Sequence, residues 1–341
     1  MKRYNVGVVG YGWAATAHIA AVNATRQGRV TAVCSSRPLD AAELSAKHGG
    51  PIAVYGVLDD LLADTTIDVI DITGLPSLHR DQAVAAARAK KHLIVEKPMA
   101  NSPEEVRDIV AAAEANGVQG CVCFECRFSN QFQVTRALID EGLLGGLHYG
   151  EVDYYHGIGP WYGQYRWNTG RKDGGSALLT AGCHALDALL MLMGDDVESV
   201  SSMSTRSTSE FFTPYEYDTS SVTILRFRNG AVGKTAAIVD CLQPYYFHTH
   251  LVGSQGSLLD NRFHSMKLKA DKGHWSELSM KMLDSGDVSD HPYQAQFQAF
   301  FDALDRGEPM PLTSLGEAKK TFDVIFAADR SAAQGGAPVT L

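Results

Sequence analysis

The sequence has few cysteines, no long run of one charge, and no clean apolar stretch long enough to cross a membrane. Its 341 residues include 30 Lys plus Arg and 39 Asp plus Glu, so the formal net charge is −9. No Lys/Arg run exceeds two residues, which leaves no basic patch for nucleic acid or an anionic bilayer. The apolar residues 177–193 include His184 and Asp187 and fall short of the roughly 20 apolar residues that a membrane span requires. We expect neither nucleic acid nor a membrane as a partner.

The chain begins with a short apolar segment that runs into a glycine turn, without an apolar signal core or a small-residue cleavage site. We therefore expect a cytoplasmic protein whose six cysteines are reduced. Three of them, Cys121, Cys123 and Cys126, are close in sequence, but a tetrahedral metal site needs four ligands and no further His or Cys lies nearby in the sequence. We expect Cys121 and Cys123 to face one side of a buried strand as small apolar residues, and we expect no metal.

Length predicts two domains, and the first third of the chain alternates apolar strands with Ala-rich helical segments. Such alternation indicates right-handed βαβ units in a parallel sheet that is covered on both faces. The fold class is therefore α/β, with an N-terminal doubly wound parallel sheet. We expect strands at 5–9, 30–34, 69–73, 92–95 and 120–124, and helices around 15–25, 39–48, 82–90 and 103–116.

The pattern changes after residue 125 to a helix at 131–141, a strand at 148–156, an aromatic loop, an apolar helix at 176–193 and strands from 198 to about 269. The dipeptide Asn229-Gly230 predicts a hairpin with a type I′ turn. Before it, Val222 and Ile224 alternate with Leu225 and Phe227. One sheet face should pack on helices, and we expect a second subunit to cover the other.

Two amphipathic helices close the chain, with apolar stripes that predict core or interdomain packing. The stripes are Tyr293, Phe297, Phe300, Phe301 and Leu304, then Leu315, Ala318, Phe322, Ile325 and Phe326. We divide the chain into domains 1–122 and 123–341, and leave open whether the last helices pack back on the first domain.

A GxGxxA pattern at residues 10–15 follows the first predicted strand and precedes a helix. In a βαβ unit the first glycine permits a tight turn, the second lets a diphosphate approach the backbone, and the helix start binds the anion. The pattern predicts dinucleotide contacts from Gly10, Gly12, Trp13 and Ala14.

The second strand ends without the acidic residue that would bind both ribose hydroxyls of NAD. Instead the chain reads Ser35-Ser36-Arg37, and two hydroxyls with a guanidinium fork suit a 2′-phosphate. We predict that NADP(H) is preferred and that NAD(H) is possible. The alternative is that Arg37 stacks on adenine while Ser35 binds the ribose in a tolerant site.

Further motifs sharpen this interpretation, and with them the sequence resembles the glucose–fructose oxidoreductase, inositol dehydrogenase and rhizopine-catabolism (Gfo/Idh/MocA) family. These motifs are Ser77–His79, Glu96-Lys97-Pro98, Arg127-Phe128, the GG…GxHxxD helix that contains His184, and the terminal FxxxF…AxxSAxxGxxV pattern. The resemblance implies a Rossmann domain followed by an α/β domain with a large, open, mostly antiparallel sheet. It also implies a homodimer or homotetramer formed through the sheets.

The resemblance further implies hydride transfer between nicotinamide and a secondary alcohol or carbonyl of a sugar, cyclitol or sugar derivative. Lys97 would contact the reacting oxygen, and His184 would act as acid/base, roles that suit an ammonium and an imidazole. We add Thr73, His79, Glu96 and Lys97 to the expected cofactor contacts. One position departs from the family: Thr180 stands where an Asp is usual, four residues before the histidine, and a hydroxyl can hold substrate but cannot stabilise an imidazolium.

The segment before His184 is crowded with aromatic and basic side chains, as in sites that stack sugar rings. We expect substrate contacts from Lys97, Tyr155, His156, Arg166, Trp167, Thr180 and His184; the alternative is an aromatic cluster that only holds the loop. His248 and His250 alternate on one strand and share a face, either toward the substrate or on an exposed side of the sheet.

Two other functions stay open. An NAD-dependent glycosidase would oxidise its substrate transiently, eliminate the aglycone and reduce the sugar again without net redox. A nicotinamide-sensing regulatory protein would need neither Lys97 nor His184 for its effect.

Overall fold

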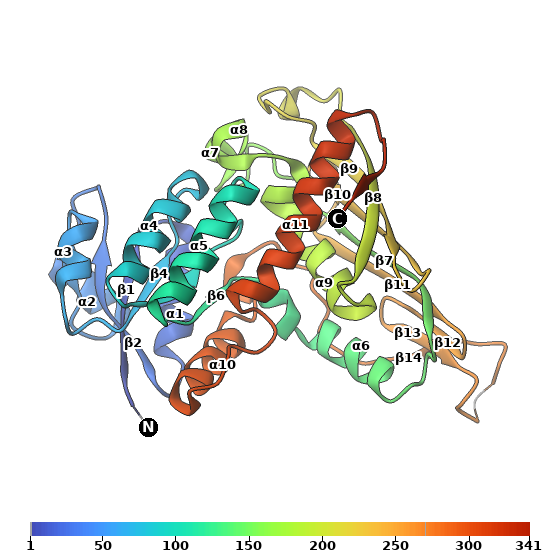
Figure 1. Cartoon of the computed structure of the whole chain (residues 1–341), viewed down its shortest axis with the longest axis horizontal. Helices are drawn as coiled ribbons and strands as arrows, with labels where there is room; N and C mark the ends of the chain where they lie inside the picture. Colours follow the sequence, from blue (N-terminus) through green and yellow to red (C-terminus); the bar gives the residue numbers. More distant parts are fainter. Residues whose placement is uncertain (1, 270) are drawn as a thin grey trace. The chain divides into compact units, whose positions relative to one another are not determined.

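The computed structural model describes residues 2–269 and 271–341 (Figure 1). The chain separates into two compact units. The first combines residues 1–125 with 287–319, and the second combines 126–286 with 320–341. The helix α11, Leu315–Ala333, runs from the first unit into the second.

The first unit contains a parallel sheet whose described strands follow the order β3-β2-β1-β4-β5-β6. Its strands are Tyr4–Val9, Gly28–Cys34, Ala53–Tyr55, Val69–Ile72, His92–Val95 and Gly120–Val122 for β1 to β6. The chain order reverses between β1 and β4, and at such a point the carboxyl ends of the strands leave a crevice for a ligand. The doubly wound parallel sheet predicted from the sequence is confirmed.

Helices connect these strands: α1 Trp13–Asn23, α2 Ala41–His48, α3 Leu58–Ala63, α4 Pro76–Arg88 and α5 Pro103–Asn116. The predicted α5 has the observed ends because both are signalled locally. Ser102 accepts a hydrogen bond from the Glu105 N–H at 3.2 Å, and Gly117 ends the helix with a φ of 65°. The prediction began α4 too late, since Pro76 already starts it, and it missed the short elements β3 and α3.

The first unit also includes α10, Tyr293–Arg306, which is distant in sequence and packs beside α1. The Phe301 ring of α10 stacks on Tyr4 of β1 at 5.6 Å between centroids. The predicted apolar stripe of this helix is confirmed as core, because Phe297, Phe300 and Phe301 are fully buried.

The second unit holds a sheet whose described strands follow the order β14-β13-β12-β11-β7-β10-β9-β8-β15. All neighbours are antiparallel except β10 and β7, which confirms the mostly antiparallel sheet. The strands are β7 Leu147–Tyr155, β8 Val197–Thr205, β9 Ser220–Phe227, β10 Val232–Ile238, β11 Tyr246–Gly253, β12 Gly256–Leu259, β13 Arg262–Ser265, β14 Ser276–Glu277 and β15 Val339–Thr340. The helix α6, Asn130–Asp140, precedes β7.

The hairpin between β9 and β10 forms where it was predicted, but its turn type differs. Gly230 has a φ of 88°, whereas Asn229 is not among the described non-glycine residues with positive φ. A type I′ turn needs positive φ at both central positions, so that prediction is wrong. The single left-handed glycine fits a longer loop that ends in a G1 bulge, and the Asn229 side chain accepts the Ala231 N–H at 2.9 Å.

Side chains of β9 alternate between two environments, as predicted. Leu225 and Phe227 are buried, while Val222 and Ile224 are 42% and 53% exposed. The helix α9, Cys183–Met193, covers the buried face: a Cβ at Gly150 of β7 would collide with Met193. We call the opposite face, which carries Val222 and Ile224, the outer face of the sheet.

The predicted helix at 176–193 is not regular. It begins with a π-helical turn, Leu178–Gly182, and continues as α9. By length and composition, the longer segment Arg171–Met193 could cross a membrane. However, 83% of its most apolar 18-residue stretch is buried inside the protein, as in the core helix of a globular protein. A Cβ at Gly182 would collide with Ala237 of β10, so the glycine lets this turn lie directly on the sheet.

Candidate cofactor and catalytic site

The glycine turn lies at the crevice between β1 and β4. Gly10 has a φ of 95°, and a Cβ there would lie 3.1 Å from the Gly74 backbone, so only glycine fits. At Gly12, in contrast, an added Cβ would meet no described atom within 4 Å apart from its neighbours in the chain. No side chain of the described residues caps α1, which starts at Trp13. The start of α1 therefore offers space and helical N–H groups to a diphosphate.

Arg37 lies beside this turn. Its Nη2 donates to the Tyr11 carbonyl oxygen at 2.5 Å, and its backbone N–H donates to the Ser35 hydroxyl at 3.1 Å. Ser36 and Arg37 are exposed, whereas Ser35 is buried. The end of β2 thus presents a guanidinium next to the glycine turn, where a Rossmann domain binds the adenosine ribose.

Thr73 and His79 make hydrogen bonds to backbone carbonyl groups around the crevice. The Thr73 hydroxyl donates to the Val9 carbonyl at 3.1 Å. The His79 ring is fully buried, with Nδ1 2.8 Å from the Pro98 carbonyl and Nε2 3.2 Å from the Gly74 carbonyl. His79 therefore ties the loop after β4 to the loop after β5, and a direct contact of either residue with the cofactor stays a prediction.

Lys97 follows β5 at the same edge of the sheet. Its side chain is partly exposed, and the residues on either side of it, Glu96 and Pro98, are buried. The Lys97–Pro98 peptide is cis, and the Lys97 N–H donates to Glu96 Oε2 at 2.7 Å. Because β1, β4 and β5 are adjacent and parallel, Gly10, Thr73 and Lys97 all lie at one edge of one sheet.

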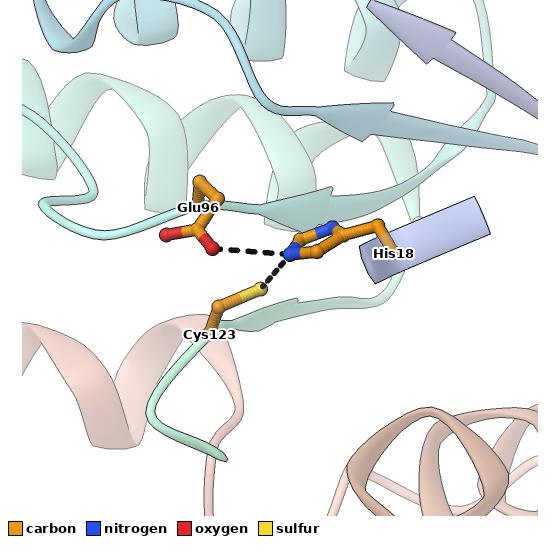
Figure 2. A group of neighbouring side chains, drawn as sticks. All are labelled: His18, Glu96 and Cys123. Atoms are coloured by element: carbon orange, nitrogen blue, oxygen red, sulfur yellow. Dashed lines mark hydrogen bonds and ion pairs between the residues drawn. The ribbon is translucent and has the colours of Figure 1, made fainter. Parts of the chain in front are cut away.

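A buried group of charged side chains lies beneath this edge, and the sequence did not lead us to it. Figure 2 shows the His18 ring of α1 pointing at Glu96, with Cys123 beside it. His18 Nδ1 lies 3.0 Å from Asp71 Oδ1, and Nε2 lies 3.0 Å from Glu96 Oε1. His18 and Asp71 interrupt otherwise apolar runs, which is the signal that could have marked them, although not as partners.

The electrostatics of this group favour an ion-pair chain. Burial would lower the pKa of His18, but the charge and hydrogen bond of Asp71, with those of Glu96, outweigh burial and raise that pKa to about 10. Burial would raise the pKa of Glu96, yet the hydrogen bond and charge of His18, with the charge of Lys97, lower it to about 2. An imidazolium thus lies between two carboxylates.

The same three side chains, His18, Glu96 and Cys123, are close enough to share a metal ion. However, burial raises the pKa of the Cys123 thiol well above its usual value, and a metal binds the thiolate. The Sγ to Nε2 distance is 3.9 Å, while Nε2 is already paired with Glu96. We therefore interpret the group as an ion pair with a neutral thiol beside it. Cys121 and Cys123 are both buried, as predicted.

This ion pair makes stability depend on pH. A raised His18 pKa contributes stability that is complete below about 6.5 and is lost as the pH rises through about 10. A lowered Glu96 pKa contributes stability above about 4.5 that is lost toward pH 2. We expect the free energy of unfolding, measured with urea, to fall between about pH 6.5 and 10, and His18→Gln to flatten this alkaline fall. An equal slope in His18→Gln would contradict the assignment; Ile19→Val, next along α1 and equally buried, should keep the wild-type slope.

In the second unit, Asp187 of α9 holds a structural salt bridge. Arg127 donates from Nε and Nη2 to its two carboxylate oxygens at 2.6 and 2.7 Å, and the Thr321 hydroxyl of α11 donates at 2.7 Å. Both ion-pair partners are buried. Arg127 and Asp187 belong to separate motifs of the sequence. Their salt bridge, with the Thr321 hydrogen bond, fixes α9 to the segment before α6 and to α11.

Thr180 and His184 lie on the two sides of the junction between the π turn and α9, and both are buried. Thr180 hydrogen-bonds the Tyr217 hydroxyl, which itself donates to the Asn168 carbonyl at 2.5 Å. The π turn interrupts the regular α-helical hydrogen-bond pattern directly before His184. π turns often occur at functional positions, and no local sequence pattern predicted this one.

The predicted substrate residues divide between two faces of the sheet. Tyr155 stacks on Tyr246 on the outer face, with 6.2 Å between ring centroids, whereas Tyr154 lies on the face that α9 covers. Tyr155 is therefore not brought to the side of His184, because successive strand residues point to opposite faces. His248 is also on the outer face, 3.2 Å from Asp260, and His250 shares that face.

The remaining predicted contacts lie after β7. His156 is buried, with Nδ1 2.8 Å from the Tyr154 hydroxyl, and it lines a pocket of about 430 Å³ with Trp161 and Tyr245. Trp161 is 58% exposed, while Arg166 is exposed and Trp167 is partly exposed on the helix Tyr165–Asn168.

The other aromatic side chains of this loop hold it in place. The Tyr165 hydroxyl donates to the Phe211 carbonyl at 2.7 Å, and the Tyr162 hydroxyl donates to the Gly286 carbonyl at 3.2 Å. Tyr162 and Tyr165 therefore help to hold the loop, as does Trp161, whose Nε1 donates to the Gly157 carbonyl at 2.8 Å. Contacts of Arg166 and Trp167 with a substrate stay a prediction.

Comparisons with known proteins agree with this architecture. A family sequence profile described as "Oxidoreductase family, NAD-binding Rossmann fold" matches residues 4–124, and one described as "GFO/IDH/MocA C-terminal domain" matches residues 132–259. The chain is 30% identical to a glycosyl hydrolase family 109 protein of Shewanella amazonensis over 54% of this chain and 41% of that protein. It is 28% identical to scyllo-inositol 2-dehydrogenase (NADP(+)) of Bacillus subtilis over 55% of this chain and 51% of that protein.

The chain thus spans about half the length of these curated relatives or less. A solved levoglucosan dehydrogenase in complex with NADH and levoglucosan has a similar fold, with a TM-score of 0.85 and 22% identity over 100% of this chain and 99% of that one. The two matched profiles, the reversal of strand order at the glycine turn, and the Glu96-Lys97-Pro98 motif at the same sheet edge lead to one conclusion: this chain belongs to the Gfo/Idh/MocA family of oxidoreductases with an NAD-binding Rossmann fold.

Proposed function

We propose that this protein is an NAD(P)-dependent oxidoreductase that acts on a secondary alcohol or carbonyl of a sugar, cyclitol or sugar derivative. The observation that carries the proposal is the shared edge of the parallel sheet, where the open helix start at Gly12 follows β1 and the partly exposed Lys97 follows β5, with β4 between these two strands. A relative and a structural neighbour named for inositol and levoglucosan support the substrate class.

A bound nicotinamide would supply or accept the hydride. In the proposed mechanism, the Lys97 ammonium donates a hydrogen bond to the substrate oxygen and stabilises its developing negative charge. His184 takes the hydroxyl proton in oxidation and returns it in reduction. Thr180 holds a substrate hydroxyl in place of the usual carboxylate, and His156, Arg166 and Trp167 bind the rest of the sugar. Residues 1–122 would bind the cofactor, and 123–341 the substrate and a second subunit.

The test is to incubate the purified protein with a panel of sugars and cyclitols and follow the absorbance of the reduced nicotinamide in both directions. We expect at least one substrate to give turnover that depends on added NADP or NAD. Silence across a broad panel in both directions would overturn the assignment of net redox activity.

The similarity to a glycosyl hydrolase family 109 protein favours a second candidate, a glycosidase that uses tightly bound NAD without net redox. This candidate predicts that dinucleotide co-purifies with the protein and that an aryl glycoside releases its aglycone without added cofactor. Turnover that requires a stoichiometric supply of nicotinamide would exclude it.

We propose that NADP(H) is preferred, because Arg37 and the Ser35-Ser36 pair replace the usual acid beside the glycine turn. Arg37→Ala should weaken NADPH binding by about 10- to 100-fold, since a hydrogen bond to a charged group contributes about 1.5–3 kcal/mol. NADH binding should change by less than about threefold. Fluorescence titration with both cofactors measures this, and equal losses for NADPH and NADH would instead indicate adenine stacking.

We also propose a homodimer or homotetramer in the cytoplasm, assembled through the outer face of the nine-stranded sheet. Met203 is paired with Val222 on this face, and Met203, Val222 and Ile224 are 68%, 42% and 53% exposed in the single chain. An apolar strip of this kind is typical of a covered surface. Sedimentation equilibrium would show a monomer if this assignment is wrong.

A further inference from the structure

We propose that His18 is a positioning residue for Lys97, acting through Glu96. This inference rests on the proposed function, in which the Lys97 ammonium meets the reacting oxygen. All the groups involved belong to the first unit, and each link of the chain is a direct contact (Figure 2).

The first link is the imidazole of His18, which is fully buried. Its two nitrogens face carboxylates at the same time, Nδ1 at Asp71 (3.0 and 3.1 Å) and Nε2 at Glu96 (3.0 Å). A ring that donates from both nitrogens carries a proton on each. Buried charges are tolerated only in well-formed pairs, so the position of His18 determines the position of both carboxylates.

The second link is the Glu96 carboxylate, whose two oxygens have different partners. Oε1 accepts from His18 and from the Tyr293 hydroxyl at 2.8 Å, while Oε2 accepts the Lys97 N–H at 2.7 Å. Any rotation of the carboxylate breaks contacts at both oxygens. The backbone at Lys97 is therefore fixed from below by a carboxylate that His18 and Tyr293 hold on its other side.

The third link is α1, which carries His18 and also begins at the glycine turn. Asp71 lies on β4, whose neighbour β1 leads into that turn. One rigid helix thus joins the start that would hold the diphosphate to the group that orients Lys97. A salt bridge used only for stability could lie anywhere in the core, whereas this one contacts the backbone of the proposed catalytic lysine.

Two near-isosteric variants separate the contacts of His18. In His18→Gln the amide can replace Nε2 and keep a donor toward Glu96, while in His18→Asn it can replace Nδ1 and keep a donor toward Asp71 alone. We expect His18→Asn to lower kcat by about 10- to 100-fold, as expected for a slightly misplaced catalytic group. His18→Gln should stay within about threefold of wild type, and NADPH dissociation constants should change by less than about twofold in both.

Controls guard against a general loss of folding. Ile19→Val, also fully buried in α1, should lower the melting temperature without changing kcat. Tyr293→Phe removes one donor to Glu96 and keeps the ring, so it should lower kcat less than His18→Asn does. Equal kcat in His18→Asn and His18→Gln, at matched fractions of folded protein, would overturn the positioning role.

A measurement without turnover separates this inference from the proposed function. Reductive methylation with ¹³C-formaldehyde labels lysines, and the Lys97 signal is identified by its loss in Lys97→Arg. We expect one narrow signal in wild type and in His18→Gln, and a shifted or broadened signal in His18→Asn. If no substrate is turned over but the signal changes as expected, the proposed function fails and the positioning role stands. An unchanged signal in His18→Asn overturns the positioning role, whatever the activity.

Discussion

Replacing Lys97 by Met should lower kcat by about 10²- to 10³-fold, the usual loss when one donor to a developing oxyanion is removed. Met keeps much of the side-chain length and volume but has no hydrogen to donate and no charge. Lys97 is among the expected cofactor contacts, but the glycine turn and Arg37 supply the others, so the NADPH dissociation constant should change by less than kcat does. Steady-state kinetics on the best substrate of the panel, with fluorescence titration of NADPH, measure both quantities.

Two further variants make this result specific. Lys97→Arg keeps the charge but places a planar fork where a point charge is needed, so its kcat should lie between those of wild type and Lys97→Met. Lys90→Met removes a lysine at the opposite end of β5, where Nζ donates to the Asn116 carbonyl at 3.0 Å, and should leave kcat unchanged. If kcat in Lys97→Met stays within about threefold of wild type, Lys97 does not contact the reacting oxygen.

The parts of the fold that could be predicted are those with local causes. The glycine turn was recognisable because Gly10 must adopt a positive φ against the Gly74 backbone, and α5 because Ser102, Pro103 and Gly117 mark its ends. The elements β3 and α3 were missed because three and six residues are too few to establish a periodicity. The π turn before α9 was missed because no local sequence pattern marks it; it lies where Gly182 closely approaches Ala237 of the sheet.

The candidate site could be predicted where residue type alone sets the chemistry. Arg37 was singled out because an acid was missing, yet its hydrogen bond to the Tyr11 carbonyl depends on how two loops meet. Asp71 lies 53 positions and Glu96 lies 78 positions after His18 in the sequence. The pairing of these residues therefore follows from the order of the strands and not from a motif. Tyr155 was grouped with His156 as a neighbour in sequence, although alternation in a strand sends such neighbours to opposite faces.

The buried pair of Arg127 and Asp187 gives the second large effect, on stability. We expect Asp187→Asn to lower the free energy of unfolding by about 3–5 kcal/mol, because it removes the carboxylate that accepts two hydrogen bonds from the buried Arg127 guanidinium. Asn has the same shape as Asp, so packing around α9 is preserved and the loss reports on charge. Urea denaturation followed by circular dichroism measures it, and a loss below about 1 kcal/mol would show that water or another group compensates.

An exposed pair provides the matched comparison. Arg226 Nε lies 3.1 Å from Glu198 Oε2, but these side chains are 64% and 44% exposed, against 9% and 1% for Arg127 and Asp187. Glu198→Gln should therefore cost no more than about 1 kcal/mol. The double replacement Arg127→Met with Asp187→Leu should recover much of the stability lost in Asp187→Asn, since apolar residues of similar volume often replace a buried ion pair at little cost. A double variant as unstable as Asp187→Asn would mean that the pair stabilises the second unit through its geometry, including the Thr321 hydrogen bond, and not only by avoiding an isolated charge.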